Sequence, residues 1–424
     1  MKKLICILCA VCFSLAVPFH AGANAAGADK SPVFSATFLQ NWLCRDWTQE
    51  RWIREFSDAE DAGFDAIILQ SVYDIVRGSC AAGGNEQDAA AYPTAESFCM
   101  FPSQQTADYH SAQNSGDALQ LALEAAKETG MQLWIGTIND DLWWKYGWGI
   151  PEGGYFKEWS VLNAAQCAAL ITEIWTRYGN EYGGQIAGWY YVNEIWNLDA
   201  ACDGSDNGFY AEIIRENIRA SVQAVTECCP EKPILISPFY NPDISSAAGY
   251  TAFLTEVLRE FRPIDIYAGQ DGGGKEYPPV VIREWTLAQK EAVSGRMRFW
   301  VNHECFNADF SSKSIEALRE NYNAAADLAD GHILFSWNHY YAPNSELNAQ
   351  FRAFAAQRIP GDVNADGVFS ISDAVLLQKW LTTEPKTALS DWQAADFSHD
   401  GRLDARDLSL MKQSLLTNKN LEVL

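Results

Sequence analysis

Two segments of the chain place glutamate residues in a setting that suits catalysis. Asn193 and Glu194 follow the apolar run GWYYV, and Glu304 ends a second largely apolar run, RFWVNH. Cleavage of a glycosidic bond needs one carboxyl group that protonates the departing oxygen, and a second that attacks the anomeric carbon or activates water. Glu194 and Glu304 are therefore the candidate catalytic pair, if the fold brings their side chains together.

A different chemistry is encoded near the C-terminus, where a twelve-residue pattern occurs twice. DVNADGVFSISD (362–373) and DFSHDGRLDARD (396–407) have oxygen-bearing side chains at positions 1, 3, 5, 9 and 12, and glycine at position 6. This is the spacing of a calcium-binding loop, in which position 7 contributes its backbone carbonyl, so we expect two Ca²⁺ ions and no catalytic cofactor. The predicted metal ligands are Asp362, Asn364, Asp366, Val368, Ser370 and Asp373 in the first loop, and Asp396, Ser398, Asp400, Arg402, Asp404 and Asp407 in the second.

The two glutamates need a scaffold, and the residues before this tail supply a repeating one. Apolar runs of strand length alternate with segments of helical periodicity, such as 117–128 and 165–178. Eight strand–helix repeats predict an α/β fold, the closed parallel (β/α)8 or TIM barrel. An open doubly wound sheet is the alternative, but no GxGxxG motif follows the first run. The expected strands are 33–39, 66–70, 132–138, 186–192, 234–238, 264–268, 298–301 and 332–337.

The active face of such a barrel is formed by the carboxyl ends of its strands. Glu194 and Glu304 leave the fourth and seventh strands, nearly opposite one another across the mouth. Polar residues and tryptophans stand at the other strand ends, and an indole ring offers a flat apolar face that suits the CH face of a sugar. The predicted substrate-binding residues are Gln40, Trp42, Asn139, Asp140, Asn193, Trp196, Gln270, Asp271, Trp337 and Asn338.

Other interpretations of these residues remain open. A lone glutamate at a strand end is usually solvated or paired with an arginine, and a lone tryptophan usually packs in the core. If Asp271 replaced Glu304 as the second carboxylate, a wider separation would imply an inverting reaction. His303 and His339 could bind a metal with Asp271, although no HxH motif follows the first strand. The alternative function is a non-catalytic barrel that binds carbohydrate or serves as a structural passenger.

The strand ends resemble those of a large clan of glycoside hydrolases, whose barrels carry an Asn-Glu acid/base after strand four and a nucleophilic glutamate after strand seven. The resemblance implies that Glu194 is the acid/base, that Glu304 is the nucleophile of a retaining reaction, and that Asn193 contacts the sugar 2-hydroxyl. Gln270-Asp271-Gly272 and Glu304-Cys305-Phe306 are also similar to segments of a hydrolase-like barrel family without a known function. The resemblance covers residues 33 to about 345.

The two carboxyl groups need different protonation states. The acid must stay protonated near neutral pH while its partner is ionised, and close like charges together with an aromatic wall push two pKa values apart. Under this assignment, Glu194 is the group whose pKa we expect to be raised.

The C-terminal repeat closely resembles a type I dockerin, the module that attaches enzymes to the cohesins of a scaffoldin in a cellulosome. The resemblance rests on two loop–helix units with aspartate at position 12, and it covers residues 361 to about 418. It implies a cohesin partner, contacted through positions 10 and 11 of each loop, which are Ile371-Ser372 and Ala405-Arg406. Because cellulosomal enzymes mostly act on plant cell walls, it also implies a polysaccharide or oligosaccharide substrate.

The N-terminus and the composition predict an exported protein. Lys2 and Lys3, the apolar run 4–17 and the small residues 21–26 form the pattern of a signal peptide. The formal net charge of −24 disfavours nucleic acid and anionic lipid as partners, and no other stretch is apolar enough to span a membrane. We expect a signal peptide at 1–25, the barrel at 26–358 and the dockerin at 359–424, in a secreted, extracellular protein of the cellulosome.

The cysteines permit disulfide bonds but do not specify which residues pair. Cleavage of the signal peptide would leave Cys44, Cys80, Cys99, Cys167, Cys202, Cys228, Cys229 and Cys305. An even number permits disulfides in an exported chain, and Cys80 and Cys99, which flank a polar loop, are the first candidate pair. Cys228 and Cys229 are as easily two packed thiols, and the lack of CxxC pairs disfavours zinc.

Overall fold

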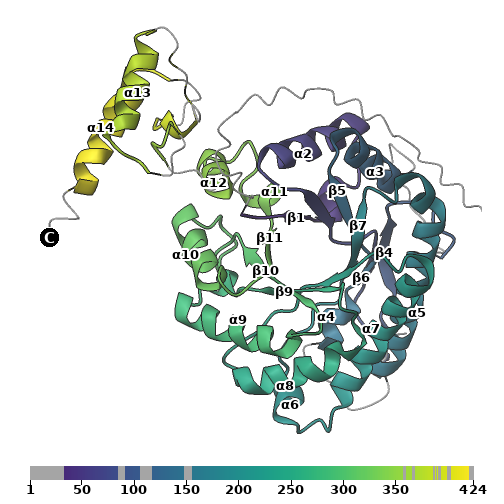
Figure 1. Ribbon diagram of the computed structural model, residues 1–424. Helices are drawn as coiled ribbons and strands as arrows, with labels where there is room; N and C mark the ends of the chain where they lie inside the picture. The colour runs from purple at the N-terminus through teal and green to yellow at the C-terminus, as the bar shows by residue number, and fades with distance from the viewer. Residues whose placement is uncertain are drawn as a thin grey trace, which may run out of the picture.

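The predicted eight-stranded barrel is confirmed. The structure, a computed structural model, describes residues 33–84, 91–105, 117–147, 155–356, 360–364, 368–384, 387, 389, 393–398 and 403–419. Its parallel strands close in the order β1-β11-β10-β9-β8-β7-β5-β2, with helices on the outside (Figure 1). The strands are β1 (Ala36–Leu39), β2 (Ala66–Leu69), β5 (Gln132–Gly136), β7 (Ile186–Tyr191), β8 (Ile234–Ile236), β9 (Ile266–Gln270), β10 (Arg298–Glu304) and β11 (Gly331–Phe335).

Helices follow the strands and cover the barrel. The helix α3 illustrates why they form: Asp117 caps its first turn by accepting a hydrogen bond from the Gln120 backbone N–H, and Gly130 ends it in a left-handed conformation. The helices of this layer are α1 (Asn41–Cys44), α2 (Gln49–Asp61), α3 (Ala118–Thr129), α4 (Leu142–Gly147), α5 (Tyr155–Tyr182), α6 (Asp199–Asp203), α7 (Phe209–Cys228), α8 (Ala247–Val257), α9 (Pro279–Val293), α10 (Ile315–Ala325), α11 (Trp337–Tyr340) and α12 (Asn348–Ala355).

Each barrel strand is buried on both faces, which explains its nearly continuous apolar sequence. In β7, Tyr190 belongs to the cluster inside the barrel, together with residues such as Phe38 and Trp134. Its neighbours Trp189 and Tyr191 belong to the larger cluster between the strands and the helices. The same alternation in β10 places Trp300, Asn302 and Glu304 on the inner side.

A second, three-stranded sheet was not predicted from the sequence. It consists of β4 (Thr94–Cys99), β3 (Tyr73–Arg77) and β6 (Ile138–Asp140), with β3 antiparallel to β4 and parallel to β6. The predicted third barrel strand, 132–138, in fact ends at Gly136, where a Cβ atom would overlap the backbone of Gln70. The chain then enters the second sheet, so Asn139 and Asp140 do not end a barrel strand.

The predicted Cys80–Cys99 disulfide is wrong, because neither residue forms a disulfide. The register of the β3–β4 pair explains why. Cys99 lies opposite Tyr73, at the start of β3, whereas Cys80 lies beyond Arg77 at the other end of that strand. Cys228 and Cys229 are also free, with their sulfur atoms 3.4 Å apart.

The C-terminal region forms a small helical unit that lies outside the barrel (Figure 1). The helices α13 (Ile371–Leu381) and α14 (Ala405–Lys419) pack against each other around a small cluster of buried side chains. That cluster contains Val363, Ala374, Leu377, Ala395 and Met411.

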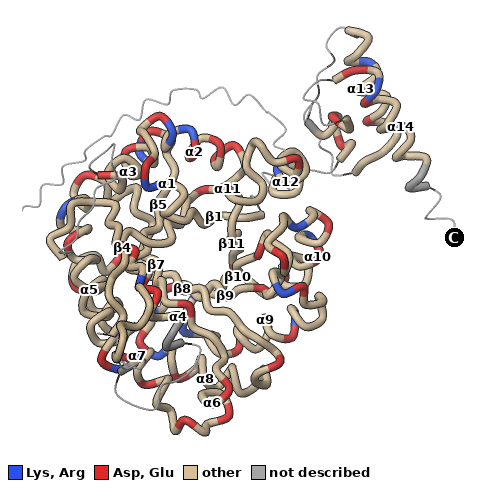
Figure 2. Tube along the Cα trace, turned by 180° about the vertical axis from the view of Figure 1, so that it is seen from behind, with Lys and Arg blue, Asp and Glu red and all other residues tan. Residues whose placement is uncertain are grey.

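Acidic residues outnumber basic ones, 55 to 31, and Figure 2 shows them spread over the helical layer and the C-terminal helices. In the part of the chain that the structure describes, no helix is both long and apolar enough to cross a membrane.

Candidate active site

Glu304 lies at the mouth of the barrel as the last residue of β10. Its side chain is on the inner side, is 8% exposed, and accepts a hydrogen bond of 2.7 Å from the backbone N–H of Gly274. Gly274 belongs to the loop after β9, the neighbouring strand. A backbone donor fixes the position of the carboxylate without adding a second titratable group.

Glu194 approaches the same place from the other side of the mouth. It follows β7 by three residues, and its carboxylate accepts a hydrogen bond from the side-chain amide of Gln270, the last residue of β9. Gln270 also donates to the Ser237 carbonyl, 3.2 Å away. Glu304 is bonded to Gly274 in the loop that follows Gln270, so both glutamates contact the end of β9 and its loop. The structure therefore brings Glu194, Gln270 and Glu304 into one site.

Burial governs the protonation of both glutamates. It raises the pKa of Glu194 to about 7, while the hydrogen bond from Gln270 partly opposes the shift. The pKa of Glu304 is also raised, first by burial and then by the nearby charges of Asp271 and Glu194. A raised pKa of Glu194 was expected from the sequence, but that of Glu304 was not, because the sequence does not show how deeply the end of β10 is enclosed.

Asp271 lies behind Glu304 and has no exposed surface. One carboxylate oxygen accepts hydrogen bonds from the backbone N–H groups of Gly273 and Glu304, at 2.8 and 3.3 Å. The other oxygen lies 2.9 Å from Nδ1 of His303, whose Nε2 lies 3.0 Å from Nδ1 of His332. Asp271 thus supports the loop that holds Glu304 and does not face the mouth, contrary to its predicted contact with substrate.

The hydrogen bonds of this Asp271–His303–His332 chain determine where its protons lie. Burial lowers the pKa of His332 to about 3, so its ring is neutral, and it also bonds to the backbone carbonyl of Ala326. Since Nδ1 of His332 faces His303, the nitrogen that donates to Ala326 is Nε2, and Nδ1 must accept from His303. His303 therefore donates through Nε2, while its Nδ1 faces Asp271.

Among the described residues, no group of three His, Cys, Asp or Glu side chains is arranged to hold a metal ion. His303 is fully buried against Asp271 and His332, whereas His339 lies in α11, stacked on Tyr340. The arrangement predicted for a metal centre, with both histidines around Asp271, is therefore not formed.

Asp140 and Asn139 form hydrogen bonds within the second sheet. Arg77 binds the Asp140 carboxylate through two nitrogens, at 2.9 and 2.6 Å, and Trp159 donates its indole N–H to the same group at 3.1 Å. Asn139 hydrogen-bonds to Asp74 on the neighbouring strand β3. The predicted role of both residues in substrate binding is thus not supported, because their polar groups are engaged within the sheet.

Asn193 points toward the helices. Its amide nitrogen donates to the side-chain oxygens of Asn163 in α5 and Asn217 in α7, at 3.1 and 3.5 Å. Asn217 also accepts the hydroxyl of Tyr191 at 2.9 Å. This buried network anchors the end of β7 to the helical layer, so the contact with a sugar 2-hydroxyl expected for Asn193 is not prepared in this structure.

Of the predicted tryptophans, Trp42 remains open, with 54% of its surface exposed. Trp196 is buried and stacks on Phe239, with ring centroids 5.6 Å apart and planes nearly parallel. Trp337 has no exposed surface and packs edge-on against Phe64.

Two polar candidates lie at the ends of β1 and β11. Asn338 donates to Glu55 in α2, so its amide points away from the mouth. Gln40 follows β1 and is half-buried, and its amide oxygen lacks a partner among the described atoms. Gln40 therefore stays available at the rim, whereas Asn338 is engaged.

The burial of Lys313 was not predicted from the sequence. Lys313 lies in a polar loop, whose composition is typical of a solvated segment. Its side chain is nevertheless only 3% exposed, and it donates a hydrogen bond to the Gly273 carbonyl at 2.9 Å. Its positive charge lowers the pKa of Glu304 against the effect of burial. No local pattern distinguishes such a lysine, because its burial depends on the packing of two loops.

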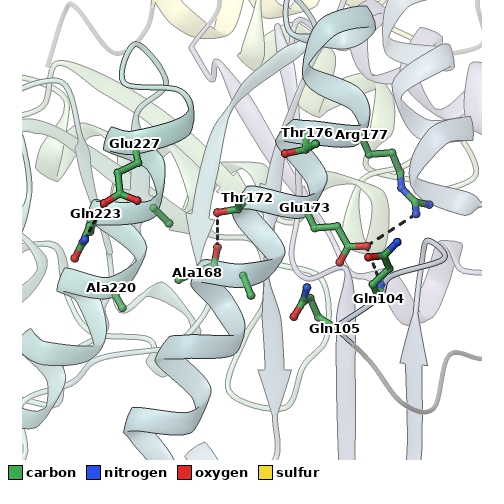
Figure 3. Close-up of a pocket in the computed structure, with 12 residues that line it drawn as sticks. Gln104, Gln105, Ala168, Thr172, Glu173, Thr176, Arg177, Ala220, Gln223 and Glu227 are labelled. Carbon is green, nitrogen blue, oxygen red and sulfur yellow. Dashed lines mark hydrogen bonds and ion pairs between the residues drawn. The ribbon is translucent and has the colours of Figure 1, made fainter.

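A groove lies away from this mouth, between α5 and α7 (Figure 3). It has a volume of about 830 Å³, and alanines of the two helices form part of its wall. Glu173 in this groove accepts the Gln104 backbone N–H at 2.8 Å and pairs with Arg177 at 3.9 Å, and Glu227 accepts a hydrogen bond from Gln223. None of the predicted catalytic residues lines the groove.

The two calcium-type loops share the same internal bonding. The position-12 carboxylate of the first loop, Asp373, accepts backbone N–H groups of Asn364 and Ser370 at 3.3 and 2.9 Å. In the second loop, Asp407 accepts the equivalent N–H groups of Ser398 and Asp404, both at 2.9 Å.

In each loop, the position-12 carboxylate thus accepts the backbone N–H groups of positions 3 and 9, and this arrangement fits a calcium site. Asp362, Asn364, Val368, Ser370, Asp373, Asp396, Ser398, Asp404 and Asp407 would hold the ions together with Asp366, Asp400 and Arg402, and the last three lie outside the described residues.

Comparison with protein families bears on both parts of the chain. Residues 34–347 match the family described as a domain of unknown function, DUF4434. The chain belongs to this family. Residues 360–416 match the dockerin type I domain, which confirms the dockerin at the C-terminus. A search of curated proteins found no match.

Among solved structures, the DUF4434 barrel with its dockerin is similar to glycoside hydrolases. A Bacteroides thetaiotaomicron protein with a proposed alpha-L-fucosidase activity shares 17% identity and a TM-score of 0.56, covering 81% of this chain and 98% of that one. The endo-1,4-beta-mannanase of Rhizomucor miehei shares 11% identity with a TM-score of 0.44, and the match covers 72% of this chain and 86% of that one. A beta-galactosidase of Marinomonas ef1 shares 12% identity with a TM-score of 0.45, and the match covers 76% of this chain and 59% of that one. At these identities, the first match supports the fold alone.

Proposed function

We propose that this protein is a secreted glycoside hydrolase of a cellulosome, which acts on plant cell-wall polysaccharide with retention of configuration. Glu194 is the acid/base and Glu304 the nucleophile. The observation that carries the proposal is that two carboxyl groups, one after β7 and one at the end of β10, are hydrogen-bonded to the end of β9 and the loop that follows it, at the carboxyl end of the barrel. The dockerin supports attachment to a cohesin and, with the predicted signal peptide at 1–25, supports export.

The surroundings of each glutamate suit its role. Glu194, with a pKa raised to about 7, keeps a proton to donate to the leaving oxygen near neutral pH. Burial and the charge of Asp271 raise the pKa of Glu304. The N–H of Gly274 and the positive charge of Lys313 oppose that shift and favour the ionised form that a nucleophile needs.

The alternative, a barrel that binds carbohydrate without cleaving it, predicts acids locked into structural ion pairs. Asp140 is such an acid, because it is bound by Arg77. Glu194 and Glu304 instead bond to a neutral amide and a backbone N–H. This contrast favours catalysis.

The test compares Glu194→Gln and Glu304→Gln with the wild-type protein on a panel of plant polysaccharides, by release of reducing ends. Each variant should lose roughly a thousandfold or more in turnover, since each removes a proton donor or a nucleophile. Neither variant should melt below the wild type, because neither substitution removes a stabilising charge. Glu320→Gln, an exposed acid in the helical layer, is the matched control and should keep full activity. Full activity in either site variant would refute the assignment.

A second measurement separates the two roles. Azide should rescue Glu304→Ala and give a product of inverted configuration, because a small anion can take the place of the missing nucleophile. Glu194→Ala should instead retain fast cleavage only of substrates with good leaving groups.

A further inference from the structure

Five rings form a continuous row at the carboxyl end of the barrel. In order they are Phe310, Phe306, Tyr340, His339 and Trp42, with successive centroid distances of 5.8, 5.7, 4.5 and 6.2 Å. The first two follow β10, the next two lie in α11 after β11, and Trp42 lies in α1 after β1. These three strands are neighbours in the barrel. The aromatic row therefore crosses three successive loops of the active face.

The row is anchored in the middle and open at its ends. Tyr340 is buried and Phe306 is half-buried, whereas His339 and Trp42 are exposed and 74% of the surface of Phe310 is exposed. A single exposed apolar side chain needs no explanation, but a linked series next to an active site is typical of a binding surface.

The backbone of Phe310 strengthens this interpretation. It has a φ of 63°, the left-handed conformation that glycine or asparagine adopts with little strain and a bulky residue adopts rarely. Phe310 lies in a tight turn in which the Asn307 N–H bonds to the Ser311 carbonyl and the Phe310 N–H bonds to the Asn307 carbonyl. The turn thus holds an exposed ring at a position that would favour a smaller residue. Strain of this kind is concentrated at functional sites.

The row passes beside the proposed nucleophile. Gly274, whose N–H holds Glu304, packs so closely on Phe306 that a Cβ atom at Gly274 would overlap the ring. Burial raises the pKa of Tyr340, and the charge of Glu304 contributes to that shift. A molecule lying along the row would therefore pass the proposed nucleophile near Phe306 and Tyr340, in the middle of its path.

We propose that the aromatic row is a binding platform for an extended, neutral glycan chain, which runs past the proposed nucleophile over the loops of β10, β11 and β1. The inner rings stack on one another, and the exposed rings at the two ends, Phe310 and Trp42, contact the CH faces of sugar units, which fixes the path of the chain without requiring charge. The net charge of −24 would repel a polyanionic chain, so the glycan is one without uronic acids. This inference rests on the proposed function and adds the class of substrate and its direction.

The experiment measures binding by the full-length protein carrying Glu304→Gln, so that the glycan is not consumed. The probes are soluble glucomannan, arabinoxylan, xyloglucan and mixed-linkage glucan, with polygalacturonate as the charged comparison. On the neutral probe that binds best, Phe310→Gly and Trp42→Ala should each weaken binding roughly tenfold, equivalent to the loss of about one stacking contact. Val280→Ala, a side chain 72% exposed on α9, is the control and should leave binding unchanged.

The glycine substitution separates a binding role from a structural one. Phe310→Gly relieves the left-handed strain, so its melting temperature should equal or exceed that of the parent while its glycan binding falls. Unchanged binding in both ring variants, or equal weakening by Val280→Ala, would overturn the platform and leave the hydrolase assignment intact. Tighter binding of polygalacturonate than of every neutral probe would also overturn it. If the protein with Glu304 intact cleaved none of these probes and the Gln variant bound none, both proposals would fail.

Discussion

At the scale of single residues, Glu194 has two influences on its pKa, burial and one hydrogen bond from Gln270. A carboxyl group whose pKa rises from 4.5 to about 7 on folding binds its proton more tightly in the folded state. Its effect on stability is therefore neutral below about pH 4.5 and becomes destabilising as the pH rises to about 7, by up to about 3 kcal/mol.

The corresponding prediction is that Glu194→Gln gains stability relative to wild type between pH 4.5 and pH 7.5, because the glutamine cannot ionise. Denaturant unfolding of both proteins at these two pH values checks it, and Glu320→Gln controls for the loss of a surface charge. An identical pH dependence of all three proteins would contradict a raised pKa. Activity should also fall on the alkaline side near pH 7, as the acid loses its proton.

Asp271 gives a prediction about positioning. Asp271→Ala would leave the buried N–H groups of Gly273 and Glu304 without acceptors, each at a cost of about 1–3 kcal/mol. Asp271→Asn keeps an oxygen for those groups, and its amide can donate to His303. We therefore expect alanine to lower the free energy of unfolding by several kcal/mol more than asparagine does.

The pH profile of Asp271→Asn tests the effect of this carboxylate on Glu304. Because the charge of Asp271 contributes, after burial, to the raised pKa of Glu304, the asparagine variant should shift the acid limb of kcat/KM, which reports Glu304, toward lower pH. An acid limb that stays at the wild-type pH would contradict this contribution.

At the scale of elements, the second sheet depends on the Arg77–Asp140 pair. Arg77→Met would leave the Asp140 carboxylate, which is 3% exposed, without its cation, and we expect a loss of about 3–5 kcal/mol in the free energy of unfolding. The double variant Arg77→Met with Asp140→Leu should recover much of that loss, since no buried charge remains. Denaturant titration of the three variants checks this. A stable Asp140→Asn protein with abolished turnover would instead restore the predicted substrate role of Asp140.

The barrel could be predicted from the sequence because each of its strands is buried on both faces and reads as a continuous apolar run. The second sheet could not, because β4 is exposed over its first three residues, β3 is only partly buried and β6 has only three residues. Glu194 and Glu304 could be proposed from the sequence because one follows a core strand and the other ends one. The outward direction of Asn193 and the burial of Lys313 depend on contacts with α5, α7 and the loop at Gly273, which are distant in sequence.

At the scale of the whole molecule, the two parts of the chain should respond differently to loss of calcium. The loop carboxylates are crowded without a cation, so chelation should disorder α13 and α14 and abolish cohesin binding. The barrel uses no metal in the proposed mechanism and should keep its activity. Circular dichroism, cohesin binding and glycan hydrolysis with calcium or with chelator would measure the three effects.

Paired loop variants refine this prediction. Asp362→Ala with Asp396→Ala removes the first ligand of each loop and should weaken calcium binding strongly, whereas Glu384→Ala, an exposed acid outside both loops, should not. Calorimetric titration of these full-length variants would measure the difference. Absence of calcium uptake by the unmodified protein would refute the calcium role of both loops.

The eight cysteines described by the structure are all free thiols, and five of them are buried. The folded barrel therefore owes nothing to covalent cross-links between them, even though an exported protein could have used such links. Its unfolding temperature should be the same with and without a reducing agent, and it should fold in a reducing cytoplasm.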